Sequence, residues 1–149
     1  MLKLIYSMAE LDAEQLIKVY RLQNPEDAKL LSYLREIFFT HKGAFYAIWE
    51  EESVYKSVVR FGPYKDGLLL HSLETDPEER RKGYASRLLT EVLRYLQSTD
   101  CKVVYSHIDK RNKVSLALHR KCSFQIVADS ATYLDGTVTQ NAWTLRNLL

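Results

Sequence analysis

The chain has 149 residues, of which 46% are hydrophobic and 27% are charged, and its formal net charge is +2. This size and composition are typical of one folded domain with a substantial core, so we expect residues 1–149 to form a single domain. The net charge is too small to favour nucleic-acid binding, and no stretch approaches the roughly 20 apolar residues that span a bilayer. We therefore expect a cytoplasmic protein with no nucleic-acid or membrane partner.

The amino-terminal part of the chain predicts one strand followed by two helices. Residues 2–6 form a short apolar run that is typical of a strand. Ser7 and Glu10 then form a capping-box pattern at the start of a helix. Asn24-Pro25 supplies an N-cap and a first helical residue for the next helix.

Three antiparallel strands are predicted next. Residues 44–49 and 54–61 are rich in β-branched and aromatic residues, and an acidic turn at 50–52 joins them. Turn-forming residues at 62–67 lead to a third strand over residues 68–75. Alternation along this third strand predicts two faces, one with Leu69, His71, Leu73 and Thr75, and the other with Leu70, Ser72 and Glu74.

The following elements predict a parallel pair of strands. An amphipathic helix begins after Gly83 and is followed by a strand over residues 102–108, so that strand, helix and strand imply a right-handed crossover. The helix places on one face the apolar residues Ala85, Leu88, Leu89, Val92 and Leu96. A helix from Asn112 and a strand over residues 124–127 come next. We therefore expect a mixed α/β sheet.

The end of the chain predicts a turn at residues 133–136 and a final strand over residues 138–145. The two cysteines, Cys101 and Cys122, are too few for a disulfide framework. We expect both to be reduced thiols of the core.

The turn before the helix at Gly83 carries the main functional signal. Residues 80–82, Arg-Arg-Lys, lie directly before Gly83. The first turn of a helix has unpaired N–H groups and the positive end of the helix dipole, so a pyrophosphate there gains several hydrogen bonds. A solvated cluster that balances the acidic residues 78–79 is the alternative. Cations at this end oppose the dipole unless an anion is present, which favours the anion site.

The spacing of these residues resembles a known signature. Arg80-x-x-Gly83-x-Ala85 is similar to the acyl-CoA motif of the GCN5-related N-acetyltransferases (GNAT), Q/R-x-x-G-x-G/A. Residues 112–124, which begin with Asn112 and end with Phe124, resemble the second cofactor motif of that family. The resemblance implies the GNAT fold, in the order β-α-α-β-β-β-α-β-α-β-β, with a central mixed sheet flanked by helices.

The resemblance implies acetyl-CoA as co-substrate and transfer of its acetyl group to an amine by direct attack in a ternary complex, without a metal. Positions that match the cofactor-binding positions of the family are Leu73, Thr75, Arg80, Arg81, Lys82, Gly83, Tyr84, Ala85, Asn112 and Ser115. Leu73 and Thr75 would offer backbone groups to the pantetheine arm, and residues 81–85 would offer N–H groups to phosphate. Asn112 is also a favoured helix cap, and the two roles are compatible.

Four residues are candidates for acid and base catalysis. His71 resembles a base position of some relatives, and an imidazole suits proton removal near neutral pH, although a structural role is the equal alternative. Glu74 is the second candidate base, and alternation predicts it on the opposite face from His71. His119 replaces the Tyr that many relatives use as acid, and either donates a proton or only packs against the cofactor sulfur. Tyr105 is the second candidate acid.

Some expectations stay open. Arg81 and Ser123 stand where the family frequently has Gly. No motif identifies the acceptor, which could be a small-molecule or a protein amine, and the family often forms dimers, so a homodimer is one option. A non-catalytic acyl-CoA-binding sensor or scaffold is the alternative function. A nucleotide-binding domain fits less well because the turn lacks the Gly-x-x-x-x-Gly-Lys pattern.

Overall fold

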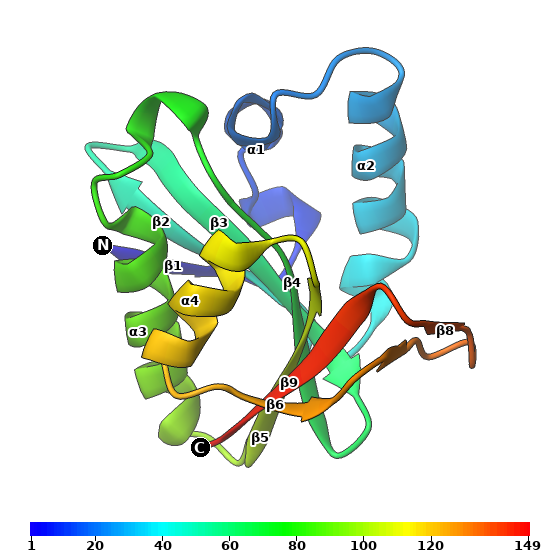
Figure 1. Ribbon diagram of the computed structural model, residues 1–149. Coiled ribbons are helices and arrows are strands. Elements are labelled where there is room, and N and C mark those ends of the chain that lie inside the picture. The colour runs from blue at the N-terminus through cyan, green and yellow to red at the C-terminus, as the bar shows by residue number, and fades with distance from the viewer.

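The computed structural model describes residues 1–149, and its central feature is a seven-stranded mixed sheet (Figure 1). In spatial order the strands are β1 (Leu2–Ile5), β2 (Phe45–Glu51), β3 (Val54–Tyr64), β4 (Gly67–Thr75), β5 (Val103–Asp109), β9 (Ala142–Leu148) and β6 (Gln125–Ala128). Neighbouring strands are antiparallel except for β4 and β5, which are parallel. The predicted mixed sheet, its antiparallel meander and its parallel pair are confirmed.

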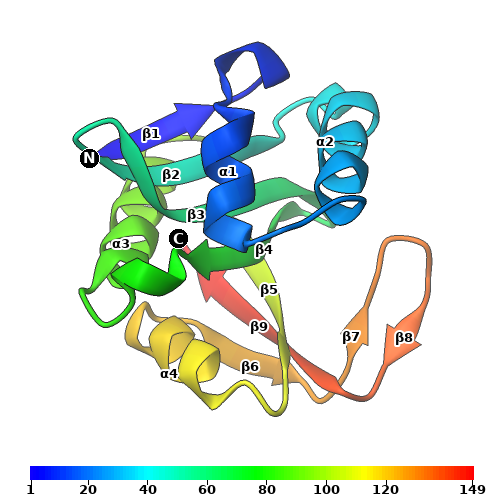
Figure 2. The same ribbon diagram turned by 90° about the horizontal axis from the view of Figure 1, so that it is seen from above.

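Helices cover both faces of the sheet (Figure 2). One face carries α1 (Ala13–Tyr20) and α2 (Glu26–Glu36), and the opposite face carries α3 (Tyr84–Gln97) and α4 (Lys113–Lys121). Three short 3₁₀ turns are formed by Met8–Glu10, Phe38–Thr40 and Pro77–Glu79. No helix here combines the length and the apolar character that a bilayer crossing requires.

Two apolar clusters pack on the two faces, because alternate residues of a strand point to opposite sides. On β3, Val58 belongs to the cluster under α1 and α2, whereas Val59 belongs to the cluster under α3. Helix α3 buries Leu88, Leu89, Val92, Leu93 and Leu96. The predicted apolar face of this helix is therefore confirmed except at Ala85, which lines a cavity instead.

Both amino-terminal helices start differently from the prediction. Ser7 precedes a 3₁₀ turn, where its hydroxyl donates to the Glu10 carboxylate (3.0 Å) and caps no backbone group. Asp12 caps α1 instead, because its carboxylate accepts a hydrogen bond from the backbone N–H of Gln15 (3.2 Å). Pro25 directly precedes α2 and no side chain caps that helix, so the predicted N-cap role of Asn24 is wrong.

The prediction of one final strand over residues 138–145 is also wrong. The chain forms a separate hairpin of β7 (Ala131–Thr132) and β8 (Val138–Thr139), with the predicted turn at 133–136 as its tip, and this hairpin extends beyond the main sheet (Figure 2). The N–H of Asn141 then donates to the Thr139 hydroxyl (3.2 Å), and such a local bond competes with strand pairing. Strand β9 starts only after this interruption and lies between β5 and β6.

A β-bulge in β4 overturns the predicted alternation along this strand. His71 pairs with Arg60 of β3 and Glu74 pairs with Val58, so β4 has one residue more than β3 between these two pairs. Ser72, within the bulge, has φ = +57°. An extra residue reverses the sides of all residues beyond it. His71 and Glu74 therefore share the α1/α2 face, and their predicted placement on opposite faces is wrong.

The parallel strands β4 and β5 pair over a short length and then diverge. Residues 68–70 of β4 pair with residues 104–106 of β5, while residues 71–75 have no partner on β5. At the paired end the strands approach closely, since a Cβ atom on Gly67 would lie 2.1 Å from the Val103 carbonyl oxygen. The divergence leaves an opening in the sheet where the backbone of β4 is unpaired on one side.

Candidate active site

A cavity of about 670 Å³ lies where the carboxyl end of β4 meets the amino ends of α3 and α4. Nine of the ten residues predicted to bind cofactor line it, namely Leu73, Thr75, Arg80, Arg81, Gly83, Tyr84, Ala85, Asn112 and Ser115. Lys82 is the exception. The two motifs, which are separated in the sequence by a helix and a strand, thus border one cavity.

The amino end of α3 presents unpaired N–H groups at this cavity. The N–H groups of Tyr84, Ala85 and Ser86 have no acceptor in the chain, and the N–H of Arg87 makes the first helical bond, to the Gly83 carbonyl oxygen (3.0 Å). Gly83 has φ = +83°, and no atom lies within 4 Å of the position that a Cβ atom would occupy. An anion can therefore approach this backbone closely.

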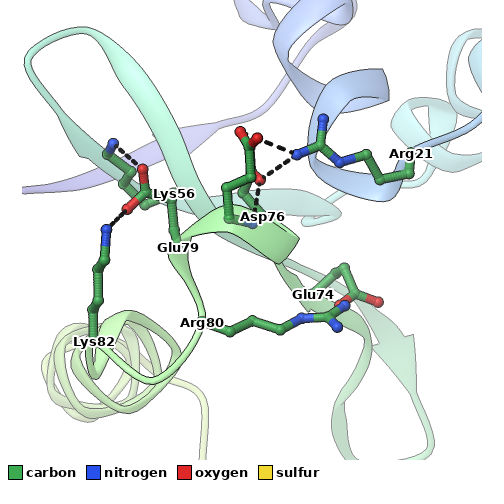
Figure 3. Close-up of polar contacts among 8 residues, drawn as sticks. Arg21, Lys56, Glu74, Asp76, Glu79, Arg80 and Lys82 are labelled. Carbon is green, nitrogen blue, oxygen red and sulfur yellow. Dashed lines mark hydrogen bonds and ion pairs between the residues drawn. The ribbon is translucent and has the colours of Figure 1, made fainter.

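The cations before Gly83 do not form one cluster. The Arg80 guanidinium pairs with the Glu74 carboxylate at 3.1 Å (Figure 3). Arg81 makes no ion pair and its backbone has φ = +66°. Arg81 is therefore the member of the predicted cluster that is left to neutralise a bound anion.

The side chain of Lys82 is paired with Glu79, which itself lines the cavity. The Glu79 carboxylate accepts from Lys82 (2.7 Å) and from Lys56 of β3 (3.0 Å), and it lies between these two ammonium groups in Figure 3. The hydrogen bonds from both lysines lower the pKa of Glu79. The positive charge of Lys82 is therefore already paired within the chain, while the phosphate contact expected of its backbone N–H stays a prediction.

Asp76 ties the turn before α3 to α1. It is buried, with 3% of its surface exposed, and its carboxylate accepts from the Arg21 guanidinium (2.8 Å) and from the Glu78 N–H (3.0 Å) (Figure 3). Arg21 is the C-cap residue of α1. The end of α1 thus fixes the segment that leads into α3.

Asn112 begins α4 and also lines the cavity. Its Oδ1 atom accepts a hydrogen bond from the N–H of Ser115 (3.1 Å), so the predicted cap is confirmed. Val114, Leu118 and Ser86 line the same cavity and were not predicted. Leu118 lies one helical turn from Ser115, and this spacing was the signal that could have identified it.

A smaller cavity of about 180 Å³ occupies the opening between β4 and β5. It shares Leu73, Asn112 and Ser115 with the larger cavity, so the two spaces adjoin. His71 and His119 both line it, from elements far apart in the sequence. A group that reaches the opening from the larger cavity would meet both imidazoles.

His71 is held neutral by its surroundings. The Nε–H of Arg60 donates to His71 Nδ1 (3.4 Å), so the proton of the neutral ring is on Nε2. Burial, and then the charges of Arg60 and His107, lowers the pKa of His71 from 6.5 to about 3. A ring with this pKa and an already bonded acceptor nitrogen is a weak base, which favours the structural role of His71.

His119 is also bonded within the protein. Its Nδ1 faces the Ser115 carbonyl oxygen (2.8 Å) and must donate, so Nε2 accepts from the Ser106 hydroxyl (3.1 Å). Only 1% of its surface is exposed, and burial lowers its pKa. A neutral ring in this arrangement is not the predicted histidinium acid. The packing role is favoured, and the ring packs edge-on against Phe124.

Tyr105, the second candidate acid, lines neither cavity. It pairs with Leu69, at the end of β4 where the strands are still joined. Its hydroxyl donates to the Asp66 carboxylate (2.7 Å), and this bond raises the pKa of the phenol. Glu74 is the acid–base candidate that lines the larger cavity, with 39% of its side chain exposed.

A hydrogen-bond network behind the bulge was not predicted. Arg60 donates to the Tyr46 hydroxyl (3.5 Å), which lies 3.0 Å from the Tyr20 hydroxyl, and Tyr20 donates to the Ser72 carbonyl oxygen (2.9 Å). Burial raises the pKa of both tyrosines. The network joins α1 to three strands, and no local pattern in the sequence indicates such long-range contacts.

The acetyltransferase (GNAT) family matches residues 5–124 of this sequence. This range covers most of the chain and includes both cofactor motifs. The chain therefore belongs to the GNAT family, which confirms the resemblance. No curated protein sequence matches the chain.

Solved acetyltransferase structures share the fold over nearly the whole length of the chain. The PaiA N-acetyltransferase of Thermoplasma acidophilum in complex with coenzyme A is 12% identical, with a TM-score of 0.72 and coverage of 100% of this chain and 99% of that chain. The ribosomal-protein-S18-alanine N-acetyltransferase of Escherichia coli is 13% identical, with a TM-score of 0.72 and coverage of 99% and 94%. A spermidine N-acetyltransferase chimera that includes the Vibrio cholerae enzyme is 14% identical, with a TM-score of 0.74 and coverage of 99% and 95%.

Proposed function

We propose that the protein transfers an acetyl group from acetyl-CoA to an amine. The observation that carries this proposal is the 670 Å³ cavity, with unpaired N–H groups at the start of α3 and an adjoining opening in the sheet. The family and the coenzyme A complex of the Thermoplasma relative support the same assignment. The pyrophosphate would accept from the N–H groups of residues 84–86, with Arg81 opposite its charge.

The pantetheine arm of the coenzyme would lie along the unpaired side of β4. Beyond Leu70 the strand has no partner on β5, so Leu73 and Thr75 can offer backbone groups to an extended pantetheine arm. An arm that follows this edge brings the thioester to the smaller opening. Exclusion of water there would strengthen the polar contacts that stabilise the carbonyl oxygen as it gains charge.

The reaction needs a group that removes a proton from the nitrogen. The amine attacks the thioester carbon, the C–N bond forms, the C–S bond breaks, and the thiolate takes up a proton while the nitrogen loses one. We infer that Glu74 takes the nitrogen proton. Its carboxylate lines the cavity wall, and only Oε1 pairs with Arg80, so Oε2 is free to accept a proton. In the neutral His71 ring, by contrast, the one nitrogen that could accept a proton already accepts from Arg60. The thiolate can be protonated by solvent.

Substitution of Glu74 tests this assignment. In Glu74→Gln, we expect kcat to fall by about 10²- to 10³-fold, as is usual for loss of a general base, without weaker coenzyme A binding. His71→Gln is the matched control and should lower kcat by less than about 10-fold, because its ring is a weak base. Thiol release from acetyl-CoA with an accepted amine measures both. A larger loss in His71→Gln than in Glu74→Gln would overturn the assignment.

Substitution of Gly83 tests whether the cavity binds the pyrophosphate of coenzyme A. Gly83→Asp places a carboxylate beside the proposed pyrophosphate, so we expect at least about 100-fold weaker coenzyme A binding by calorimetry. Gly83→Asn is the matched control, since it has the same size and the same backbone strain at φ = +83° but no charge. Equal affinity in the Asp variant and the wild type would remove the basis of the proposal.

A non-catalytic acyl-CoA-binding module is the second candidate function. It is favoured by one observation, namely that neither candidate acid is placed to protonate the thiolate, because His119 is neutral and Tyr105 lines neither cavity. Steady thiol release with any amine supports the enzyme. Tight coenzyme A binding without turnover across a broad amine panel supports the module.

A further inference from the structure

Arg60 is a partly buried cation without a counter-ion. The protein forms eleven ion pairs, and Arg60 takes part in none of them. Among lysine and arginine residues that are not exposed, only Arg60 and Arg146 lack such a partner. Withdrawing a charge from water without an opposite charge is unfavourable, so an unpaired guanidinium at this depth indicates an anion that comes from outside the chain.

Two aromatic rings fix the position of this guanidinium. Its Cζ atom lies 5.1 Å from the ring centre of Tyr33 on α2 and 5.6 Å from that of Phe38. These contacts attract a cation but supply no negative charge. The side chain is therefore oriented in advance, which lowers the entropy cost of binding a ligand to it.

Most of the hydrogen-bonding capacity of Arg60 is unused. Of its five N–H groups, one donates to His71 at 3.4 Å and one to Tyr46 at 3.5 Å, both at the long limit for a hydrogen bond. The Tyr46 phenol is protonated, since burial raises its pKa, and so it does not act as a counter-ion. Three N–H groups remain, which is enough for the two parallel bonds that a carboxylate accepts.

The location of Arg60 connects it to the opening in the sheet. Arg60 pairs with His71 across β3 and β4 and packs against Tyr33 of α2, whereas the 670 Å³ cavity is lined by residues of α3 and α4. These two pairs of helices cover opposite faces of the sheet (Figure 2). His71 lines the opening between β4 and β5. If coenzyme A fills the α3/α4 side, an amine must reach the thioester from the Arg60 side.

We propose that Arg60 binds a carboxylate of the acceptor, so that the amine is one that carries a carboxylate, such as an amino acid, rather than a polyamine. This inference rests on the proposed acetyl transfer and names its substrate class. A single guanidinium matches the single charge of a carboxylate, and its planar N–H groups match the two carboxylate oxygens. The same positive charge would repel a polycation.

Matched pairs of amines test the proposal. Alanine, lysine, tyrosine and glutamate are compared with their α-carboxamides and with spermidine, and thiol release from acetyl-CoA is measured. We expect the wild type to prefer the carboxylate member of an accepted pair by about 100-fold in kcat/KM, as is typical of a desolvated hydrogen bond to a charged group. Equal use of the carboxamides, or a preference for spermidine, would overturn the proposal.

Variants show whether Arg60 is the source of this preference. In Arg60→Met, we expect the ratio of kcat/KM between acid and amide to fall to about 1, and Arg60→Lys should restore part of it, because an ammonium keeps the charge without the two-pronged geometry. Arg146→Met is the matched control, which removes the other unpaired cation that is not exposed and should leave the ratio within about twofold of the wild type. An unchanged ratio in Arg60→Met would contradict the proposal.

Binding measurements separate this proposal from the proposed function. The N-acetyl forms of the same four amino acids, as products, should bind the wild type in calorimetry and bind Arg60→Met at least about 10-fold more weakly. If the wild type binds coenzyme A but neither acetylates nor binds any of these carboxylates, this proposal fails alone. If the wild type does not bind coenzyme A, the proposed function fails.

Discussion

His71 shows at the scale of one residue how position determines chemistry. The ring is inside the opening where the reaction is proposed, but burial and the neighbouring Arg60 lower its pKa to about 3. A neutral ring that accepts a hydrogen bond from Arg60 fits a structural role better than proton removal. The low pKa of His71 also makes the free energy of unfolding depend on pH.

We expect the free energy of unfolding to decrease as the pH falls from about 6.5 to about 3. In this window the unfolded chain binds a proton at His71 and the folded chain does not, so acid favours unfolding. His107 and His119 act in the same direction, because burial lowers the pKa of each. At about 1.4 kcal/mol per pKa unit, the lowered pKa of His71 alone accounts for a loss of up to roughly 5 kcal/mol.

Urea unfolding at a series of pH values between about 3.5 and 7.5 measures this effect. His71→Gln keeps an acceptor for Arg60 but does not titrate, so its stability should depend less steeply on pH. An equal slope in the wild type and in this variant would show that His71 is protonated in the folded protein. The variant also serves as the control for the Glu74 experiment.

Arg81 and Ser123 show, at the scale of single residues, what the family motif can and cannot predict. Both stand where the family frequently has glycine, and both have a left-handed backbone, with φ of +66° and +72°. This conformation costs a residue other than glycine about 1–2 kcal/mol. The backbone conformation that favours glycine is therefore present at both positions, a point that the sequence left open. The motif did not predict which cations remain unpaired, because ion pairs such as Arg80 with Glu74 depend on the fold.

At the scale of elements, the end of α1 holds both ends of the functional part of β4. Tyr20 donates to the Ser72 carbonyl oxygen at the bulge, and the next residue, Arg21, pairs with Asp76 at the turn before α3. Two consecutive residues thus fix the strand segment that lies between the proposed acceptor and the proposed coenzyme. We infer that α1 positions the anion site without touching it.

Arg21→Gln should therefore weaken coenzyme A binding by about 5- to 10-fold, because the turn before α3 loses an anchor and the buried Asp76 loses its charge partner. Since Arg21 is partly exposed, the accompanying loss of stability should be about 1–2 kcal/mol. Lys18→Gln is the matched control, because Lys18 is an exposed cation of the same helix without an ion pair. Calorimetry with coenzyme A, performed well below the unfolding temperature of each variant, measures the effect. Unchanged affinity in Arg21→Gln would show that the turn keeps its shape without α1.

The elements differed in how far the sequence could predict them. Helix α3 and the strands of the meander have a strong periodicity, because each buries one face, and they were predicted correctly. The bulge in β4 and the hairpin of β7 and β8 were not, since strand register depends on the partner strand. The bulge matters most for function, because it moves Glu74 to the side of His71.

At the scale of the whole molecule, the opening between β4 and β5 connects the two faces of the sheet. The larger cavity adjoins it from the α3/α4 side, and Arg60 lies beside it on the α1/α2 side. The parallel pair of β4 and β5, at which the opening forms, could be predicted from the order of strand, helix and strand. The partial burial of Arg60 could not be predicted from the sequence, because it depends on packing against α2.

An opening that can be reached from opposite faces has a kinetic consequence. A coenzyme on one side and an amine on the other would use separate entrances, so neither would have to leave before its counterpart could bind or depart. Such an arrangement requires no compulsory order of addition, and it lets each product escape through the route by which its precursor arrived.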